Sequence, residues 1–140
     1  MTLLYRGYIP LDGKKAIMGF KNKTSEELLT LEQASSFNSY GGVLSDNTIL
    51  IDIDDLEQSD ILFNIVQTKQ LKCKVIETTR GKHFLFRVDR PIPNRTHIKL
   101  GIGLTADIKP SFVYSALYCF LNSKVCHPLS PSKSSFHITF

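Results

Sequence analysis

The stretch that decides the fold is residues 48–55, Thr-Ile-Leu-Ile-Asp-Ile-Asp-Asp, in which an apolar run leads into three carboxylates. Its bulky and β-branched residues predict a strand that is buried on both faces. Side chains alternate along a strand, so Asp52 and Asp54 are expected on one side with Cα atoms about 6.5 Å apart. Asp55 points the other way and ends the strand or caps the next element. Because two carboxylates on one face repel each other, a divalent metal ion with oxygen ligands is the most economical partner for them.

Length and composition describe an ordinary globular chain. One domain is expected for 140 residues, and 42% apolar with 21% charged residues is typical of soluble proteins. No apolar run is long enough to span a bilayer, and the N-terminus lacks the apolar region of a signal peptide. We therefore expect a cytoplasmic protein with no membrane partner. Its three cysteines form no Cys-x-x-Cys pair and are expected to be free thiols.

Charge is unevenly distributed along the chain. Residues 1–55 contain five Lys and Arg against eight Asp and Glu, residues 56–109 contain ten against five, and residues 110–140 contain two Lys and no acid. A basic middle that follows the acidic strand suits a polyanionic substrate held near metal-binding acids. Charged residues that simply cover solvated faces are the alternative.

The remaining pattern predicts an α+β fold with a mixed, largely antiparallel sheet and flanking helices. A capping box formed by Thr24 and Glu27 starts the first helix, and Ser59 or Asp60 caps the second. The predicted helices cover 24–37 and 60–71, and the predicted strands cover 8–11, 43–44, 48–54, 74–79, 83–88, 97–100 and 104–109.

Two connections are expected to organise these strands. The turn at 45–47 is hairpin-like, and a right-handed crossover places strand 74–79 near strand 48–54 in one sheet. The stretch 112–121 fits a strand or a helix equally well, and 130–135 has the composition of a loop or loose tail.

Three chemistry-bearing pieces stand out: the strand with Asp52 and Asp54, His83 after a glycine turn, and Asp107 on a later strand. Alternation along that later strand places Lys109 on the same face as Asp107. Each piece also has a simpler structural interpretation. These are strand-end acids paired with Lys or Arg, a packed hairpin histidine, and a surface ion pair between Asp107 and Lys109.

In this order the pieces resemble the three signature motifs of the archaeo-eukaryotic primase superfamily. The closest branch is the primase–polymerase (prim-pol) domain of phage and plasmid replication proteins. The first motif is the hydrophobic strand 49–54 ending in Asp-x-Asp, the second is Gly-Lys-His at 81–83, and the third is Ala-Asp at 106–107. The resemblance covers residues 8–109 and implies a prim-pol, RRM-like catalytic core.

The chain is short for that family, and the pattern fades at Pro110. We therefore expect a prim-pol-like core over 1–109, followed by a truncated or diverged C-terminal segment over 110–140. That segment is either part of the same single domain or a loose tail.

The resemblance implies a role for each matched residue. The catalytic residues, which would also bind Mg²⁺ or Mn²⁺, are Asp52, Asp54 and Asp107. The nucleotide-binding residues are His83, which would contact the triphosphate, together with Arg80, Gly81, Lys82 and Lys109. Nucleotidyl transfer with paired metal ions needs a carboxylate cluster of this kind and basic groups on the phosphates.

The function implied is metal-dependent primer synthesis or strand extension on a single-stranded DNA template, with NTPs or dNTPs as substrates. The sequence has no Gly-x-x-x-x-Gly-Lys-Ser/Thr phosphate loop, so any replicative helicase would be a separate chain. Two alternatives stay open. One is a catalytically inactive prim-pol relic that binds nucleotide or single-stranded nucleic acid, and the other is a glycosyltransferase in which Asp-x-Asp holds a metal and a nucleotide sugar.

Overall fold

The structure is a computed structural model that describes residues 4–110, 114–118 and 125–126. Its elements in chain order are β1 (Tyr5–Asp12), β2 (Lys15–Ala16), the 3₁₀ turn η1 (Ser25–Glu27), α1 (Leu31–Ala34), β3 (Ser39–Leu44), β4 (Thr48–Ile53), α2 (Leu56–Thr68), β5 (Cys73–Glu77), β6 (Lys82–Arg87), β7 (Arg95–Lys99), β8 (Thr105–Lys109), β9 (Tyr114–Tyr118) and β10 (Val125–Cys126). Strands and helices together make an α+β fold, as the sequence predicted.

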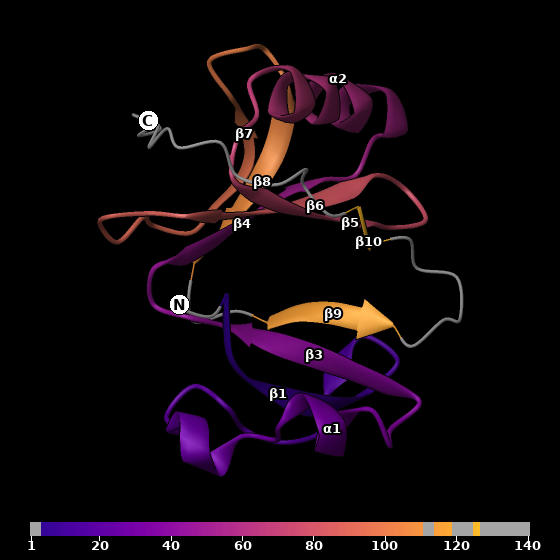
Figure 1. Ribbon diagram of the computed structural model, residues 1–140, viewed down its shortest axis with the longest axis vertical. Coiled ribbons are helices and arrows are strands. Elements are labelled where there is room, and N and C mark those ends of the chain that lie inside the picture. The colour runs from indigo at the N-terminus through magenta and orange to yellow at the C-terminus, as the bar shows by residue number, and fades with distance from the viewer. Residues whose placement is uncertain (1–3, 111–113, 119–124, 127–140) are drawn as a thin grey trace.

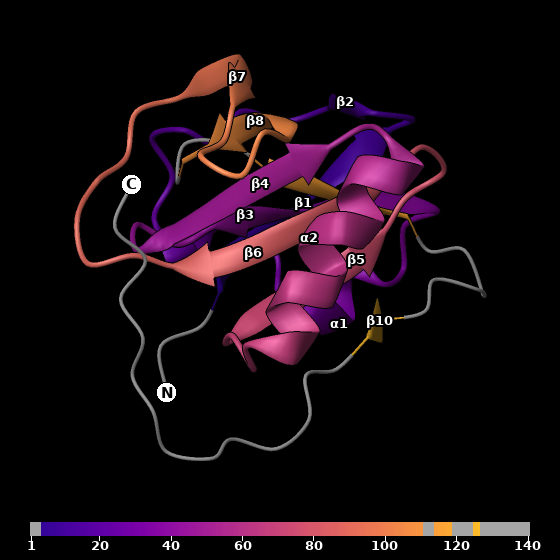
Figure 2. The same cartoon turned by 90° about the horizontal axis from the view of Figure 1, so that it is seen from above.

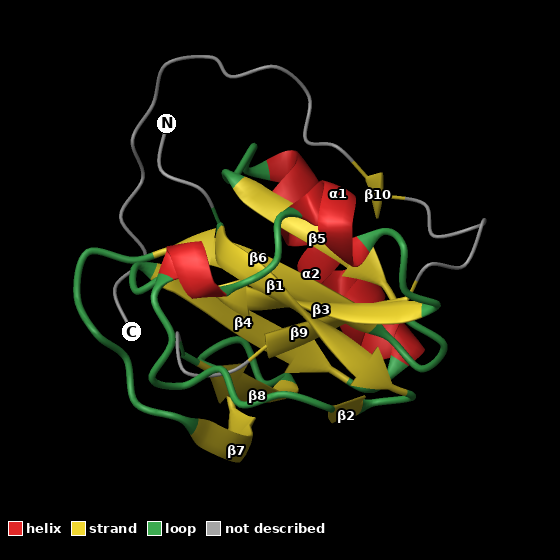
Figure 3. Cartoon of the chain, turned by 90° about the horizontal axis from the view of Figure 1, so that it is seen from below, coloured by secondary structure: helices red, strands yellow, loops and turns green. Residues whose placement is uncertain are grey.

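The strands form two sheets, one above the other in Figure 1. The four-stranded sheet has the order β2-β1-β3-β9, and the six-stranded sheet has the order β10-β5-β6-β4-β8-β7. Neighbouring strands are antiparallel throughout. Helix α2 lies across β6 and β5 on the outer face of the six-stranded sheet (Figure 2), and α1 lies beside the four-stranded sheet at the opposite end (Figures 1 and 3).

Strand β4 lies at the centre of the six-stranded sheet, between β6 and β8. Both β4 and β5 are antiparallel to β6, so β4 and β5 run parallel to each other on either side of it. Helix α2 connects β4 to β5. The predicted strand–helix–strand unit is therefore present in one sheet, with β6 inserted between its two strands.

Strand β4 is buried on both faces, as predicted. The core on the α2 side includes Ile49, Ile51, Ile53, Leu62, Val66, Phe84 and Phe86. The core on the other side joins the two sheets and includes Leu50, Ile76 and Leu85 with Tyr5 and Leu44. Burying such a side chain contributes about 1.5–3 kcal/mol. Because side chains alternate, Asp52 shares the facing of Leu50 and points toward the four-stranded sheet.

The predicted helix over 24–37 is wrong. Thr24 and Glu27 do form a capping box, but it starts only the short turn η1, and a second capping box at Thr30 starts α1. Between them Leu29 exchanges two backbone hydrogen bonds with Tyr8, of 2.9 and 3.0 Å. Leu28 is buried beside β1 and β3. Packing of the extended residues against β1 therefore outweighs the local helix signal.

Helix α2 begins earlier than predicted, at Leu56 instead of residue 60. Its N-cap is Asp55, whose carboxylate accepts a hydrogen bond of 2.8 Å from the backbone N–H of Gln58. Ser59, the expected cap, is buried inside the helix and donates its hydroxyl proton to the carbonyl of Leu56. Of the two roles expected for Asp55, ending the strand or capping the next element, the structure shows the second.

The turn at 45–47 exists but does not form a hairpin. The backbone N–H of Thr48 donates to the carbonyl of Ser45 at 2.9 Å, yet the flanking strands β3 and β4 belong to different sheets. The ambiguous stretch 112–121 contains a strand, β9, which pairs with β3. Strand β10 pairs with β5, and the loop expected at 130–135 lies outside the described residues.

Two further features concern the described part of the chain. Neither of its α-helices has the length and apolar character needed for a bilayer crossing. Cys73 is a buried free thiol, and burial raises its pKa to about 12.

Candidate functional site

Strand pairing brings three of the predicted site residues side by side. In the six-stranded sheet Asp52 of β4 is opposite His83 of β6 on one side and opposite Asp107 of β8 on the other. Directly paired residues of antiparallel strands project to the same face, with Cβ atoms about 4.5–5.5 Å apart. The three residues therefore form one row across the sheet, with their side chains on the face that points away from α2.

Asp52 is the most enclosed member of this row, because its side chain is only 10% exposed. One carboxylate oxygen, Oδ2, accepts a hydrogen bond of 2.5 Å from Nζ of Lys109. The other, Oδ1, lies 3.3 Å from Nε2 of His83, yet it is buried and has no hydrogen-bond partner within the described residues. Lys109 and His83 thus each lie beside one of the two carboxylate oxygens of Asp52.

The surroundings of Asp52 stabilise its charged form. Burial acts to raise its pKa, but His83 and Lys109 together outweigh burial and hold the pKa of this carboxyl well below its usual range. Asp52 is therefore an ionised carboxylate near neutral pH, placed between two basic groups.

Acid is expected to remove the stabilisation that this arrangement provides. The folded-state pKa lies below the value of about 3.9 typical of an unfolded chain, so the Asp52 contribution is complete above about pH 4 and is lost as the pH falls toward the folded-state pKa. Urea midpoints measured between about pH 6 and pH 3 should decline more steeply for the wild type than for Asp52→Asn, whose amide does not titrate. Equal slopes would contradict the ion pairing of Asp52.

Asp107 supports the edge of the sheet as well as facing the site. Its Oδ1 accepts a hydrogen bond of 2.8 Å from the backbone N–H of His97, at a register shift between β7 and β8. His97 has φ of +50°, in the left-handed region that non-glycine residues rarely adopt. The Asp107 carboxylate thus fixes an irregular backbone, and no sequence signal pointed to this contact.

Asp54 is separated from Asp52 by its position and by its partner. It lies just beyond β4, where its Oδ2 forms an ion pair of 2.6 Å with Arg80. Both side chains are more than half exposed, so the pair contributes little to stability. The structure thus pairs Asp54 with Arg80 and Asp52 with Lys109, the arrangement expected from the simpler interpretation of strand-end acids.

The turn before His83 is pressed against the end of β4. A Cβ on Gly81 would overlap the carbonyl oxygen of Ile53 and would lie 3.0 Å from the backbone nitrogen of Asp55. Thr78 holds the turn, because its hydroxyl accepts the Gly81 N–H at 3.1 Å and its own N–H donates to the Gly81 carbonyl at 3.0 Å. A glycine at this position lets the His83 strand approach the Asp52 strand closely.

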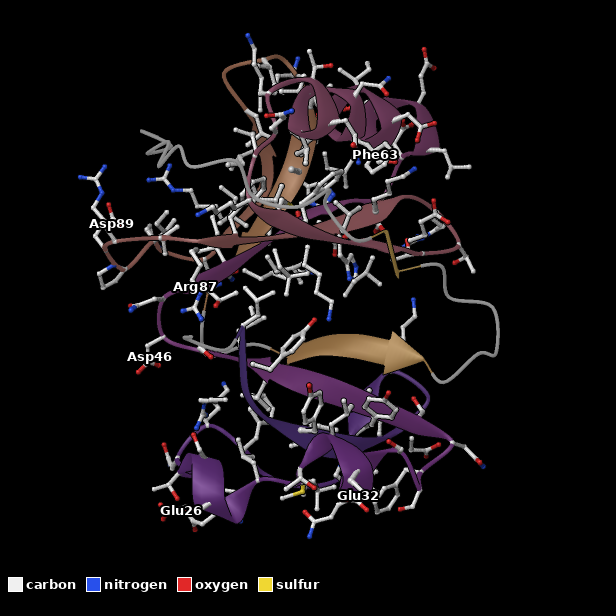
Figure 4. All side chains as sticks on the ribbon, in the orientation of Figure 1. Glu26, Glu32, Asp46, Phe63, Arg87 and Asp89 are labelled. Atoms are coloured by element: carbon white, nitrogen blue, oxygen red, sulfur yellow. The ribbon has the colours of Figure 1, made fainter. Side chains whose placement is uncertain are left out.

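Lys82 does not join the other predicted nucleotide-binding residues. It is 7% exposed, its Nζ forms an ion pair with Asp60 of α2, and that Nζ lies 5.8 Å from the ring centroid of Phe63. Phe63 is labelled on α2 in Figure 4. Because β6 begins at Lys82, alternation sends Lys82 toward α2 and His83 to the opposite face.

The carboxylates are of the kind that a hard divalent cation prefers, but their arrangement in this structure does not fit one. Asp52 and Asp107 are opposite each other in the strand pairing, and Asp54 follows Asp52 by two residues, beyond the end of β4. The side chains themselves point to Lys109, the His97 backbone and Arg80. In this arrangement no three Asp, Glu, His or Cys side chains in the described ranges are grouped closely enough to hold a metal ion.

Comparison with known proteins adds no identification to this geometry. The chain matches no family model, no curated protein and no solved structure.

Proposed function

We propose that the chain is a nucleotidyltransferase of the primase–polymerase type, which extends strands or makes primers on a single-stranded DNA template. The observation that supports this most is the single row of Asp52, His83 and Asp107 on three adjacent strands. These residues are far apart in the sequence, and each comes from a different motif of the resemblance to the primase superfamily. Their convergence on one sheet face is what such a site requires.

The chain's own residues have separable tasks in this proposal. Asp52, Asp107 and Asp54 would hold Mg²⁺ or Mn²⁺, which when bound neutralises phosphate charge and lowers the pKa of the attacking 3′-hydroxyl. His83 donates a hydrogen bond to the triphosphate of the incoming nucleotide, where a charge-assisted contact is strong. Asp54 can take part only by exchanging its exposed Arg80 partner for the cation.

The basic groups of the site fit a polyanionic substrate. Lys109 and His83 border Asp52 directly, and Arg80 lies near the end of β4 with its side chain 65% exposed. The proposed substrates are NTPs or dNTPs, and the proposed partners are single-stranded DNA and a separate replicative helicase. The proposed reaction would take place in the cytoplasm.

A non-catalytic relic that binds nucleotide or single-stranded nucleic acid is the second candidate. It is favoured by the two ion pairs, since Lys109 and Arg80 already neutralise the acids of the first motif. A glycosyltransferase is a weaker candidate, because its Asp-x-Asp pair gives no task to His83 or Asp107.

Primer extension separates these candidates. The purified chain is incubated with a labelled primer on a single-stranded template, with dNTPs or NTPs, and with Mg²⁺, Mn²⁺ or EDTA. Template-dependent incorporation that EDTA abolishes supports the proposal. Binding of the template without incorporation under any of these conditions supports the relic, and hydrolysis or transfer of a nucleotide sugar supports the glycosyltransferase.

A further inference from the structure

Strand β7 and the loop before it form an edge of the six-stranded sheet that contains basic residues and no acid (Figure 2). Within residues 90–106 the chain has no Asp or Glu, and all of its basic residues are exposed. These residues, which we call the basic edge, are Arg90, Arg95, His97 and Lys99. A one-sign surface of this kind attracts a polyanion.

The irregular backbone of β7 makes this edge a poor partner for another strand. Between Arg95 and Ile98, β7 has one residue more than β8 has between the residues opposite them. His97 lies in this interval with φ of +50°, and its backbone N–H already donates to Asp107. Bulges of this kind block edge-to-edge pairing. Addition of a strand from a second copy is therefore disfavoured, and the side chains remain as the means of contact.

The bulge also places the basic side chains on both sides of the edge. Arg95 is opposite Ile108, which lies on the α2 side of the sheet. Lys99 is opposite Thr105, which lies on the other face. The side chain of His97 lies between them along the strand and is 88% exposed. The basic edge can therefore contact a single chain of negative charges from both faces of the sheet.

A single strand of nucleic acid fits this arrangement better than a duplex does. Its flexible backbone can follow a line of cations that a bulge has bent, whereas duplex DNA is stiff over about 150 base pairs. Residues 90–106 contain no Phe, Tyr or Trp on which a base could stack. Contact there would be made with phosphates, which carry no sequence information.

We propose that the basic edge binds the phosphate backbone of single-stranded DNA without sequence preference. The inference rests on the proposed function only for DNA as the natural strand, and it adds the place where that strand lies. Because β7 pairs with β8, DNA held at the basic edge lies beside the row that contains Asp107. The binding itself requires no metal ion and no residue of that row.

The test measures the affinity of the chain for a fluorescently labelled oligothymidine by anisotropy, in EDTA and without nucleotides, between about 50 and 200 mM salt. Arg95→Gln/Lys99→Gln removes one cation from each face of the edge. The slope of log affinity against log salt should become shallower by about 1.4, since each phosphate contact to a single strand contributes about 0.7. Over this range the wild type should lose about sevenfold more affinity than the variant loses.

Lys69→Gln/Lys72→Gln is the matched control, because it removes the same charge from two exposed lysines between α2 and β5, toward the opposite edge of the same sheet. This control should keep the wild-type slope. If both double variants lose the same slope, or neither loses any, the basic residues only cover a solvated surface and the proposal is wrong. Tighter binding of a duplex of equal length would also overturn it.

A measurement on the wild-type chain covers the case in which the edge variant does not fold. Reductive methylation followed by mass spectrometry reports how accessible each lysine amine is. Oligothymidine should protect Lys99 and leave Lys72 unchanged, and equal labelling of Lys99 with and without DNA would exclude the edge. A chain that protects Lys99 but incorporates no nucleotide would refute the proposed function and keep this inference, whereas incorporation without protection would refute this inference alone.

Discussion

Asp52→Asn is expected to reduce nucleotide incorporation by about 10³-fold, the largest effect of any single change in the site. Asparagine has nearly the same shape, but it removes the negative charge that would bind the proposed cation, and with it the positive charge proposed to neutralise the phosphates. Asp52 is the one acid of the site that is enclosed and adjacent to both His83 and Asp107 in the pairing. Asp52→Asn should therefore lower the rate strongly, although asparagine and aspartate have nearly the same shape.

The measurement is primer extension at saturating nucleotide, with folding of each variant checked by its melting temperature. Glu32→Gln is the matched control, since it makes the same chemical change on α1 at the other end of the molecule, where Figure 4 labels Glu32. This control should retain full activity. Incorporation at the wild-type rate by a folded Asp52→Asn variant would show that the site has been assigned wrongly.

The same assay shows whether Asp54 takes part in the reaction. Asp107 faces Asp52 but is already engaged by the His97 backbone, while Asp54 is exposed and paired with Arg80. If Asp54 leaves Arg80 to bind the proposed cation, Asp54→Asn should lower the incorporation rate nearly as much as Asp52→Asn does. If it stays with Arg80, the Asp54→Asn rate should be close to that of the wild type.

The central strand could be predicted from its hydrophobic run, and alternation predicts on which face of its own strand each site residue lies. The run over 49–53 identifies β4, and the neighbouring apolar runs identify β5, β6 and β8. The crossover rule then places β4 and β5 in one sheet, but it does not predict that β4 pairs with β6 and β8. Given that Asp52, His83 and Asp107 lie on neighbouring strands, alternation places all three on the same face of the sheet.

The division into two sheets could not be predicted in this way. Strands β3 and β4 are separated by a short turn that looks like a hairpin in the sequence. Strand β3 pairs with β1 and β9, whereas β4 pairs with β6 and β8. Long-range packing sets these pairings. Local sequence contains no information that distinguishes these pairings. For the same reason the sequence predicted one long helix where Leu28 and Leu29 instead adopt an extended conformation and pack against β1.

The facing of Lys82 could have been predicted from the sequence. The predicted strand began at His83, which left Lys82 in a turn with no defined facing. Extending it by one residue, as β6 does, assigns Lys82 to the α2 face by alternation alone. The pairing of Asp54 with Arg80 is different, because it depends on the conformation of two side chains beyond the strand ends.

Gly81→Ala is expected to destabilise the fold by about 1–3 kcal/mol or more, through overlap with backbone that cannot move away alone. The added methyl group would collide with the Ile53 carbonyl oxygen and would lie 2.9 Å from the Ile53 carbonyl carbon. Relief requires the β4 end to shift away from the turn, and that end carries Asp54 and the Asp55 cap of α2. Urea unfolding monitored by circular dichroism gives the change in stability.

Gly101→Ala is the control that isolates crowding from the general effect of removing a glycine. A Cβ at Gly101 has no neighbouring atom within 4 Å, so this variant should be as stable as the wild type or slightly more stable. The difference between the two variants then measures how tightly the His83 turn is packed against β4. Equal stability of both variants would mean that the turn and the strand end are not in contact in solution.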